Sequence, residues 1–169
     1  TWLRYAEPKN FLTVVAKDYT LKADGAQVLF QQGARLQLAD KKASAYTVKV
    51  PVRTKEGKLQ EEKVVLAANA SLHEGYLPYT TNNIIRSAFK FYDSVYGWGG
   101  LQQSVDCSSF ISNAYRTVGI FLPRNADEQE TSAGIHKKMG NMNSAQRANV
   151  IKGLTPGSTL HMDGHVMLY

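Results

Sequence analysis

The stretch Val105-Asp106-Cys107-Ser108-Ser109-Phe110 contains the only cysteine of the 169-residue chain. A turn-rich segment, Tyr-Gly-Trp-Gly-Gly at residues 96–100, precedes it, and an apolar pattern typical of a helix follows it. Cys107 is therefore predicted at the start of a helix, where unpaired backbone N–H groups favour a thiolate. From the residues alone two interpretations remain open: a catalytic nucleophile, or a buried structural thiol, because free cysteines are among the most buried residue types.

A nucleophilic cysteine needs a base from elsewhere in the chain. Of the four histidines, His165 is the best candidate, because it begins a strand directly after a tight turn predicted at residues 163–164. His161, on the partner strand, is the second candidate. Tyr96 is a candidate hydrogen-bond donor to a developing oxyanion, with simple loop packing as the alternative. Asp106 fits either a helix cap or a group that holds a substrate amine.

The second half of the chain, residues 80–169, is predicted to be an α+β domain. Its apolar spacing indicates helices first and strands after them, which is typical of that class. An Asp-Gly pair between two apolar runs predicts a β-hairpin near the end of the chain. The predicted elements are helices at about 81–92, 107–118, 125–138 and 144–150, and hairpin strands at 158–162 and 165–169.

The first half, residues 1–79, is predicted to be a separate all-β unit. Short alternating runs with turn signals every 8–12 residues are typical of a small barrel or sandwich. The predicted strands are 11–16, 26–30, 35–39, 46–52 and 63–66. No cluster in this half has catalytic spacing, so it is interpreted as a binding or positioning module.

The composition limits the possible functions. The net charge of +6 suits an anionic polymer such as a bacterial cell wall, weak nucleic-acid binding, or solubility alone. Only the modest charge supports nucleic acid, so we expect no nucleic-acid partner. No apolar run is long enough to predict a membrane span. A single cysteine excludes an internal disulfide and a cysteine-based zinc site, and no metal or cofactor is predicted.

Four segments, in order and at fitting spacing, resemble the NlpC/P60 cysteine peptidases. They are Tyr-Gly-Trp-Gly-Gly (96–100), Asp-Cys-Ser-Ser-Phe (106–110), Leu-Pro-Arg (122–124) and Gly-His-Val-Met-Leu-Tyr (164–169). The resemblance covers about residues 80–169. Residues 1–79 are similar, mainly in architecture, to the bacterial SH3-like (SH3b) domains of the dipeptidyl-peptidase VI type. The resemblance implies a papain-like α+β NlpC/P60 domain, C-terminally truncated, preceded by a small all-β SH3-like barrel.

This resemblance implies hydrolysis of the bond between γ-D-glutamate and the following L-diamino acid in peptidoglycan stem peptides, with a preference for a free N-terminal L-alanine. By matching position, Cys107 is the nucleophile, His165 the base and Tyr96 the oxyanion-side tyrosine. The expected substrate-binding residues are Asp106, Ser108 and Arg124. The family also places a third polar residue on the following strand, which is expected beyond Tyr169. A secreted or cell-envelope protein with its signal peptide removed is implied.

A different interpretation is a non-catalytic cell-wall-binding module in which the Cys107 site is vestigial. A related acyltransferase is set aside, because those proteins place the histidine before the cysteine, and here Cys107 precedes His165. The sequence leaves open whether diaminopimelate or lysine is preferred, and whether the reaction serves peptide recycling or wall remodelling.

Overall fold

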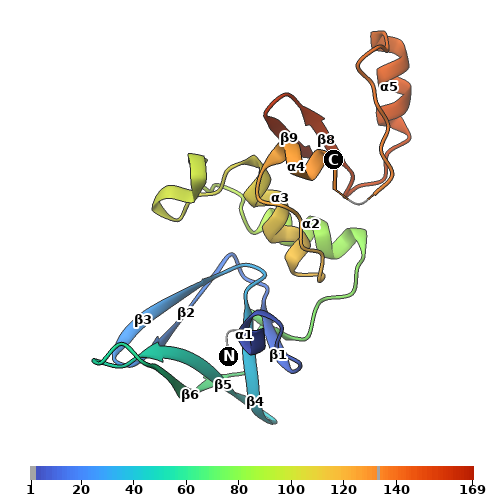
Figure 1. Ribbon diagram of the computed structural model, residues 1–169. Coiled ribbons are helices and arrows are strands. Elements are labelled where there is room, and N and C mark those ends of the chain that lie inside the picture. The colour runs from blue at the N-terminus through green and yellow to red at the C-terminus, as the bar shows by residue number, and fades with distance from the viewer. Residues whose placement is uncertain (1–2, 133) are drawn as a thin grey trace.

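The computed structural model describes residues 3–132 and 134–169, in which a strand-rich region is followed by a region of helices and one hairpin (Figure 1). After the short helix α1 (Leu3–Ala6), the first region contains only strands. They are β1 (Phe11–Val14), β2 (Asp18–Ala23), β3 (Ala26–Gln31), β4 (Arg35–Lys42), β5 (Ala45–Arg53), β6 (Leu59–Ala67) and β7 (Leu72–Glu74).

Two antiparallel sheets make up this first region. Five strands form one sheet in the order β6-β5-β4-β1-β7, while β2 and β3 pair only with each other. The β2–β3 turn has positive φ at both central residues, 49° at Asp24 and 74° at Gly25. These angles belong to the type I′ turn, whose twist matches that of a hairpin.

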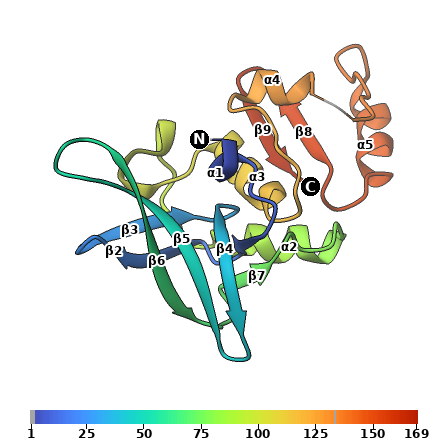
Figure 2. The ribbon, with the colours of Figure 1, turned by 60° about the horizontal axis from the view of Figure 1, so that its bottom comes forward.

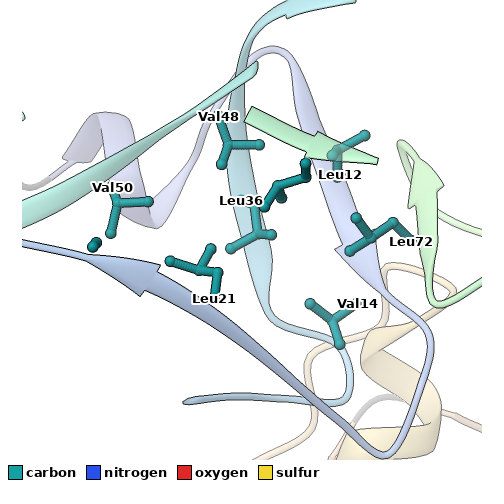
Figure 3. Close-up of a cluster of buried hydrophobic side chains, with 9 residues drawn as sticks. Leu12, Val14, Leu21, Leu36, Val48, Val50 and Leu72 are labelled. Carbon is teal, nitrogen blue, oxygen red and sulfur yellow. The ribbon is translucent and has the colours of Figure 1, made fainter. Parts of the chain in front are cut away.

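The two sheets share one hydrophobic core. Leu12, Val14 and Leu36 of the large sheet are buried together with Leu21 of β2, and Figure 3 shows Leu21 pointing toward the sheet residues. Among the described residues, however, no hydrogen-bonded pairing joins the β2–β3 hairpin to the large sheet. The predicted small barrel is therefore confirmed only as an antiparallel β region: the described residues form no closed barrel, and a hairpin covers an open sheet.

The second region has the predicted order of helices followed by a hairpin, which confirms its α+β class. Its elements are α2 (Thr81–Phe89), the 3₁₀-helix η1 (Trp98–Gln103), α3 (Cys107–Arg116), α4 (Ala126–Glu130), α5 (Ser144–Lys152), β8 (Thr159–Met162) and β9 (His165–Leu168). Helix α4 is shorter than predicted. The hydroxyls of Thr131 and Ser132 bond back to carbonyls of α4, and Gly134 has a φ of 150°, so the helical backbone does not continue. Within the described residues, no helix is long and apolar enough to cross a membrane.

Helix α3 packs against the hairpin and thereby fixes the centre of this region. Ile111 and Tyr115 of α3 are buried with Ile84 of α2 and Val166 of β9. The Tyr115 hydroxyl donates to the carbonyl of Gly157, which anchors the segment leading into β8. Figures 1 and 2 show α2 and α3 lying between the strand region and the β8–β9 hairpin.

The strand region contacts α2 and α3 through the turn between β3 and β4. The fully buried Gln32 donates from Nε2 to the Ser87 carbonyl of α2 at 3.0 Å. The next residue, Gly33, lies against α3 so closely that a Cβ placed there would be 2.3 Å from the Cβ of Arg116. The two regions are therefore joined by a close-packed contact on the helix that begins with Cys107.

Candidate active site

Cys107 is the first residue of α3, and its position is fixed by a capping box. The Asp106 carboxylate accepts a hydrogen bond from the backbone N–H of Ser109 at 2.9 Å, and the Ser109 hydroxyl accepts one from the N–H of Asp106 at 2.9 Å. This reciprocal pair satisfies two of the free N–H groups at the helix start. Cys107 is half-buried, and its thiol lies in the first turn, where the helix carries partial positive charge.

A loop whose two ends are paired through the backbone brings Tyr96 beside Cys107. An isolated bridge pairs Tyr96 with Val105, and the N–H of Gly97 donates to the Val105 carbonyl at 3.1 Å. The η1 helix occupies the loop between these paired residues. Partial desolvation raises the pKa of the Tyr96 phenol, and a hydrogen bond with the Cys107 side chain raises it further. Tyr96 thus lies near the thiol, and its side chain is exposed enough to meet a substrate.

The carboxylate of Asp106 joins three segments of the chain. Besides capping α3, it accepts from the backbone N–H of Gly99 at 3.2 Å and from both terminal nitrogens of Arg124, Nη1 at 3.2 Å and Nη2 at 2.6 Å. Arg124 Nη1 also donates to the Ser108 hydroxyl at 3.0 Å. Burial acts to raise the pKa of Asp106, but the hydrogen bonds from Arg124 and Ser109 outweigh it and hold that pKa well below its usual range.

Gln129 is a residue of this site that the sequence analysis missed. It is buried in α4, and its Nε2 donates to the carbonyls of Ser108 at 3.0 Å and Pro123 at 2.8 Å. It therefore ties the segment carrying Arg124 to the start of α3. The N–H of Asn125 donates to the Glu128 carboxylate at 3.4 Å, a contact that marks the helix start, but nothing in the sequence marks the next residue as buried.

His165 begins β9 and lies opposite Met162 across the two-residue turn, which confirms the predicted hairpin. Its neighbour Val166 is the residue that packs on α3, and adjacent strand residues point to opposite faces, so His165 lies on the face opposite Val166. Within the described residues, no hydrogen bond connects the His165 imidazole to Cys107. The structure thus groups Cys107 with Tyr96, and the pairing with His165 stays a prediction.

His161, the second candidate base, lies opposite Val166 in the hairpin. Its Nε2 is 3.0 Å from the Thr159 hydroxyl. Burial lowers its pKa, while Glu130 of α4 acts to raise it. These partners belong to β8 and α4, so His161 is a packing residue between the hairpin and α4.

Comparison with known proteins relates the segment that carries these residues to a protein family. Residues 93–169 match the NlpC/P60 family, and the matched segment includes η1, α3 and the β8–β9 hairpin. Residues 93–169 therefore resemble an NlpC/P60 domain, a family that in general comprises peptidoglycan peptidases of the cell wall. No curated protein matches the chain.

The solved structures similar to the chain include two NlpC/P60 proteins. One is a novel NlpC/P60 endopeptidase from Photobacterium damselae subsp. piscicida, with 25% identity, a TM-score of 0.62, and coverage of 86% of this chain and 30% of that one. The other is an NlpC/P60 family protein from Bacillus cereus ATCC 10987, with 18% identity, a TM-score of 0.65, and coverage of 99% and 54%. The second likeness shows the fold alone. The chain spans less than two thirds of the length of either structure.

Proposed function

We propose that the chain is part of a cysteine peptidase that hydrolyses the bond between γ-D-glutamate and the following L-diamino acid in peptidoglycan stem peptides. One observation carries the proposal: within the segment that matches the NlpC/P60 family, Cys107 stands at a capped helix start, and a backbone bridge to Val105 holds Tyr96 near it. A thiol and a nearby donor at a helix N-terminus are the parts that acyl transfer through a thioester requires.

The proposed reaction has two steps. The Cys107 thiolate attacks the γ-carbonyl carbon of D-glutamate, and the N–H of Cys107 and the Tyr96 phenol stabilise the resulting oxyanion. The His165 imidazolium then protonates the departing amine, which leaves an acyl-enzyme. Water, deprotonated by the now neutral His165, attacks the thioester carbon and releases the γ-D-glutamyl product with the free thiol. The Gly-His motif of residues 164–165 supports the role of His165.

The neighbouring polar group of Asp106, Ser108 and Arg124 is proposed to receive the substrate on the acyl side of this bond. Residues 1–79 are proposed to be an SH3b-like domain that narrows the site, so that short peptides with a free N-terminal L-alanine are preferred. The close contact of Gly33 with α3 supports a fixed position for this region. A secreted or cell-envelope location is proposed, and the net charge of +6 suits an anionic wall.

Mass spectrometry of products from L-Ala-γ-D-Glu-diamino acid peptides tests the proposal. We expect release of the diamino acid portion by the native protein, none by Cys107→Ala, and a large loss of rate in His165→Ala. His161→Ala is the matched control, because it removes an imidazole from the same hairpin without removing the proposed base. Cleavage that persists in Cys107→Ala would remove this thiol from the mechanism. Binding of the peptides without any cleavage would favour the wall-binding interpretation.

A further inference from the structure

The segment between α4 and β8 concentrates the positive charge of the chain. Residues 131–162 contain no Asp or Glu and carry a net charge of +4, with histidines counted as neutral, whereas the whole chain has +6. The rest of the chain therefore has a net charge of only +2, so the positive charge is a local feature of this segment. Its cationic residues are Lys137, Lys138, Arg147 and Lys152.

Helix α5 projects from the domain at this place. Figures 1 and 2 show α5 on the far side of the β8–β9 hairpin from α3 and the strand region. None of the residues of α5 is buried, and only Val150 and Ile151 are partly covered. The helix therefore presents most of its surface to a partner.

Local hydrogen bonds hold α5 and the preceding coil together as one unit, residues 134–152, called the projecting segment below. The Asn143 side chain caps the helix by accepting from the Gln146 N–H at 3.0 Å. Arg147 donates from Nε to the Met139 carbonyl at 3.2 Å and from Nη2 to the Gly140 carbonyl at 3.0 Å. A helix of this length is marginal in water by itself, so a ligand bound along the segment would stabilise it.

The three lysines of the projecting segment are available for a ligand. Lys137, Lys138 and Lys152 are all exposed. Within the described part of the chain, none of their ammonium groups has an ion pair or a hydrogen bond. A lysine ammonium acts as a point charge on a flexible stem, so it attracts phosphate without requiring one fixed geometry. These lysines suit a ligand with repeated negative charges and an adaptable shape.

The composition of the segment narrows the kind of anion. Residues 131–162 contain no Phe, Trp or Tyr, so the aromatic side chains on which the bases of single-stranded nucleic acids stack are missing. On α5, Arg147 lies on the same face as Val150 and Ile151, because they are three and four residues apart. The helix therefore has no continuous apolar face of the kind that inserts into a membrane surface. Both features favour a flexible polymer of phosphate groups without bases.

We propose that the projecting segment is a binding surface for a flexible, base-free polymer of phosphate or phosphodiester groups, such as a polyol phosphate chain. The surface lies across the hairpin from the helix that begins with Cys107, so a bound polymer would hold the protein in place without covering the thiol. The proposal does not depend on the reaction proposed above.

Titration of the native protein with long-chain inorganic polyphosphate, at several salt concentrations, tests the proposal. The segment variant carries Lys137→Gln, Lys138→Gln and Lys152→Gln. Its affinity should be at least about 10-fold weaker than that of the native protein at low salt. The slope of log affinity against log salt concentration should decrease in magnitude by about 2, because each lost phosphate contact removes about 0.7.

A strand variant with Lys22→Gln, Lys55→Gln and Lys58→Gln is the matched control. These three lysines of the strand region are also exposed, and their loss changes the net charge by the same amount. The strand variant should keep the native affinity within about twofold, because charges far from the bound polymer are screened. Circular dichroism should show the native fold in both variants.

Native affinity in the segment variant, or equal weakening in both variants, would overturn the proposal. A single-stranded oligodeoxynucleotide that binds more tightly than polyphosphate of equal phosphate number would assign the surface to nucleic acid and overturn it as well. So would binding to phosphatidylcholine–phosphatidylglycerol vesicles without binding to polyphosphate. The proposed reaction is tested separately: hydrolysis of soluble peptides should be unchanged in the segment variant, and a native protein that binds polyphosphate without hydrolysing peptides would reject only the reaction.

Discussion

Replacing Gly33 by alanine tests the contact between the strand region and α3. Gly33 has a φ of +80°, which alanine rarely adopts. An added Cβ would also lie 2.3 Å from the Cβ of Arg116 and 3.3 Å from the Asn113 carbonyl oxygen. Carbon atoms in contact are normally about 3.5–4.0 Å apart. The alanine is therefore accommodated only if the β3–β4 turn moves away from α3.

The expected cost has two parts. A left-handed backbone costs alanine about 1–2 kcal/mol, and overpacking a close contact costs about 1–3 kcal/mol. Gly33→Ala should thus lower the free energy of unfolding by about 2–5 kcal/mol. Gly25→Ala is the matched control, because Gly25 has a similar φ of +74° but no atom within 4 Å of the added Cβ. Gly25→Ala should show only the cost of placing alanine in a left-handed backbone conformation.

Urea unfolding of the native protein and both variants, followed by circular dichroism, gives the comparison. The two variants should differ by about 1–3 kcal/mol, with Gly33→Ala the less stable. If the strand region unfolds separately, its own transition should shift in both variants. A Gly33→Ala protein no less stable than Gly25→Ala would refute the close contact with Arg116 and, with it, the fixed placement of the strand region beside the helix of Cys107.

Three other outcomes follow from the site. The pKa of Asp106 is depressed in the fold despite burial, so the stabilisation from its carboxylate is fully present above the unfolded pKa of about 3.9 and is lost as the pH falls below that value. The free energies of unfolding of the native protein and of Asp106→Asn, measured with urea, should therefore become more similar as the pH is lowered. Tyr115→Phe removes the bond to the Gly157 carbonyl and should cost about 1 kcal/mol. Burial raises the pKa of Tyr115 to about 12. The difference in free energy of unfolding between the native protein and Tyr115→Phe should therefore be largest below about pH 10 and should decrease as the pH rises toward 12. Gln129→Leu leaves buried carbonyls without a donor, including that of Ser108, and should cost about 1–3 kcal/mol by urea unfolding, whereas a leucine at an exposed position of the same helix should cost little.

Local signals in the sequence were sufficient to predict those parts of the site whose structure depends on residues close together in the chain. The start of α3 at Cys107, the cap at Asp106 and the hairpin at residues 163–164 are all confirmed, because each depends on backbone preferences within a few residues. From the sequence, Thr81 and Ser144 are the predicted caps of α2 and α5, but in the structure Thr80 and Asn143 cap these helices. Here two adjacent residues can both cap a helix, and the sequence does not choose between them.

Long-range features of the fold were not predictable in this way. The β2 segment carries charged and polar residues between its few apolar ones, and its buried positions become clear only when the hairpin covers the sheet. The burial of Gln129 and the bonds from Arg124 to Asp106 depend on how α4 packs on α3. Motif resemblance placed Arg124 near the substrate, but its hydrogen-bond partners follow only from the packing of the two helices.

The bonds of Asp106 change how a substitution at this position should be interpreted. Its carboxylate caps α3, holds the Gly99 segment and aligns Arg124. Asp106→Ala would therefore disturb the thiol, the loop that carries Tyr96 and the arginine together, and activity would fall on every substrate. A general loss of this kind cannot distinguish an aspartate that binds a substrate amine from one that positions its neighbours.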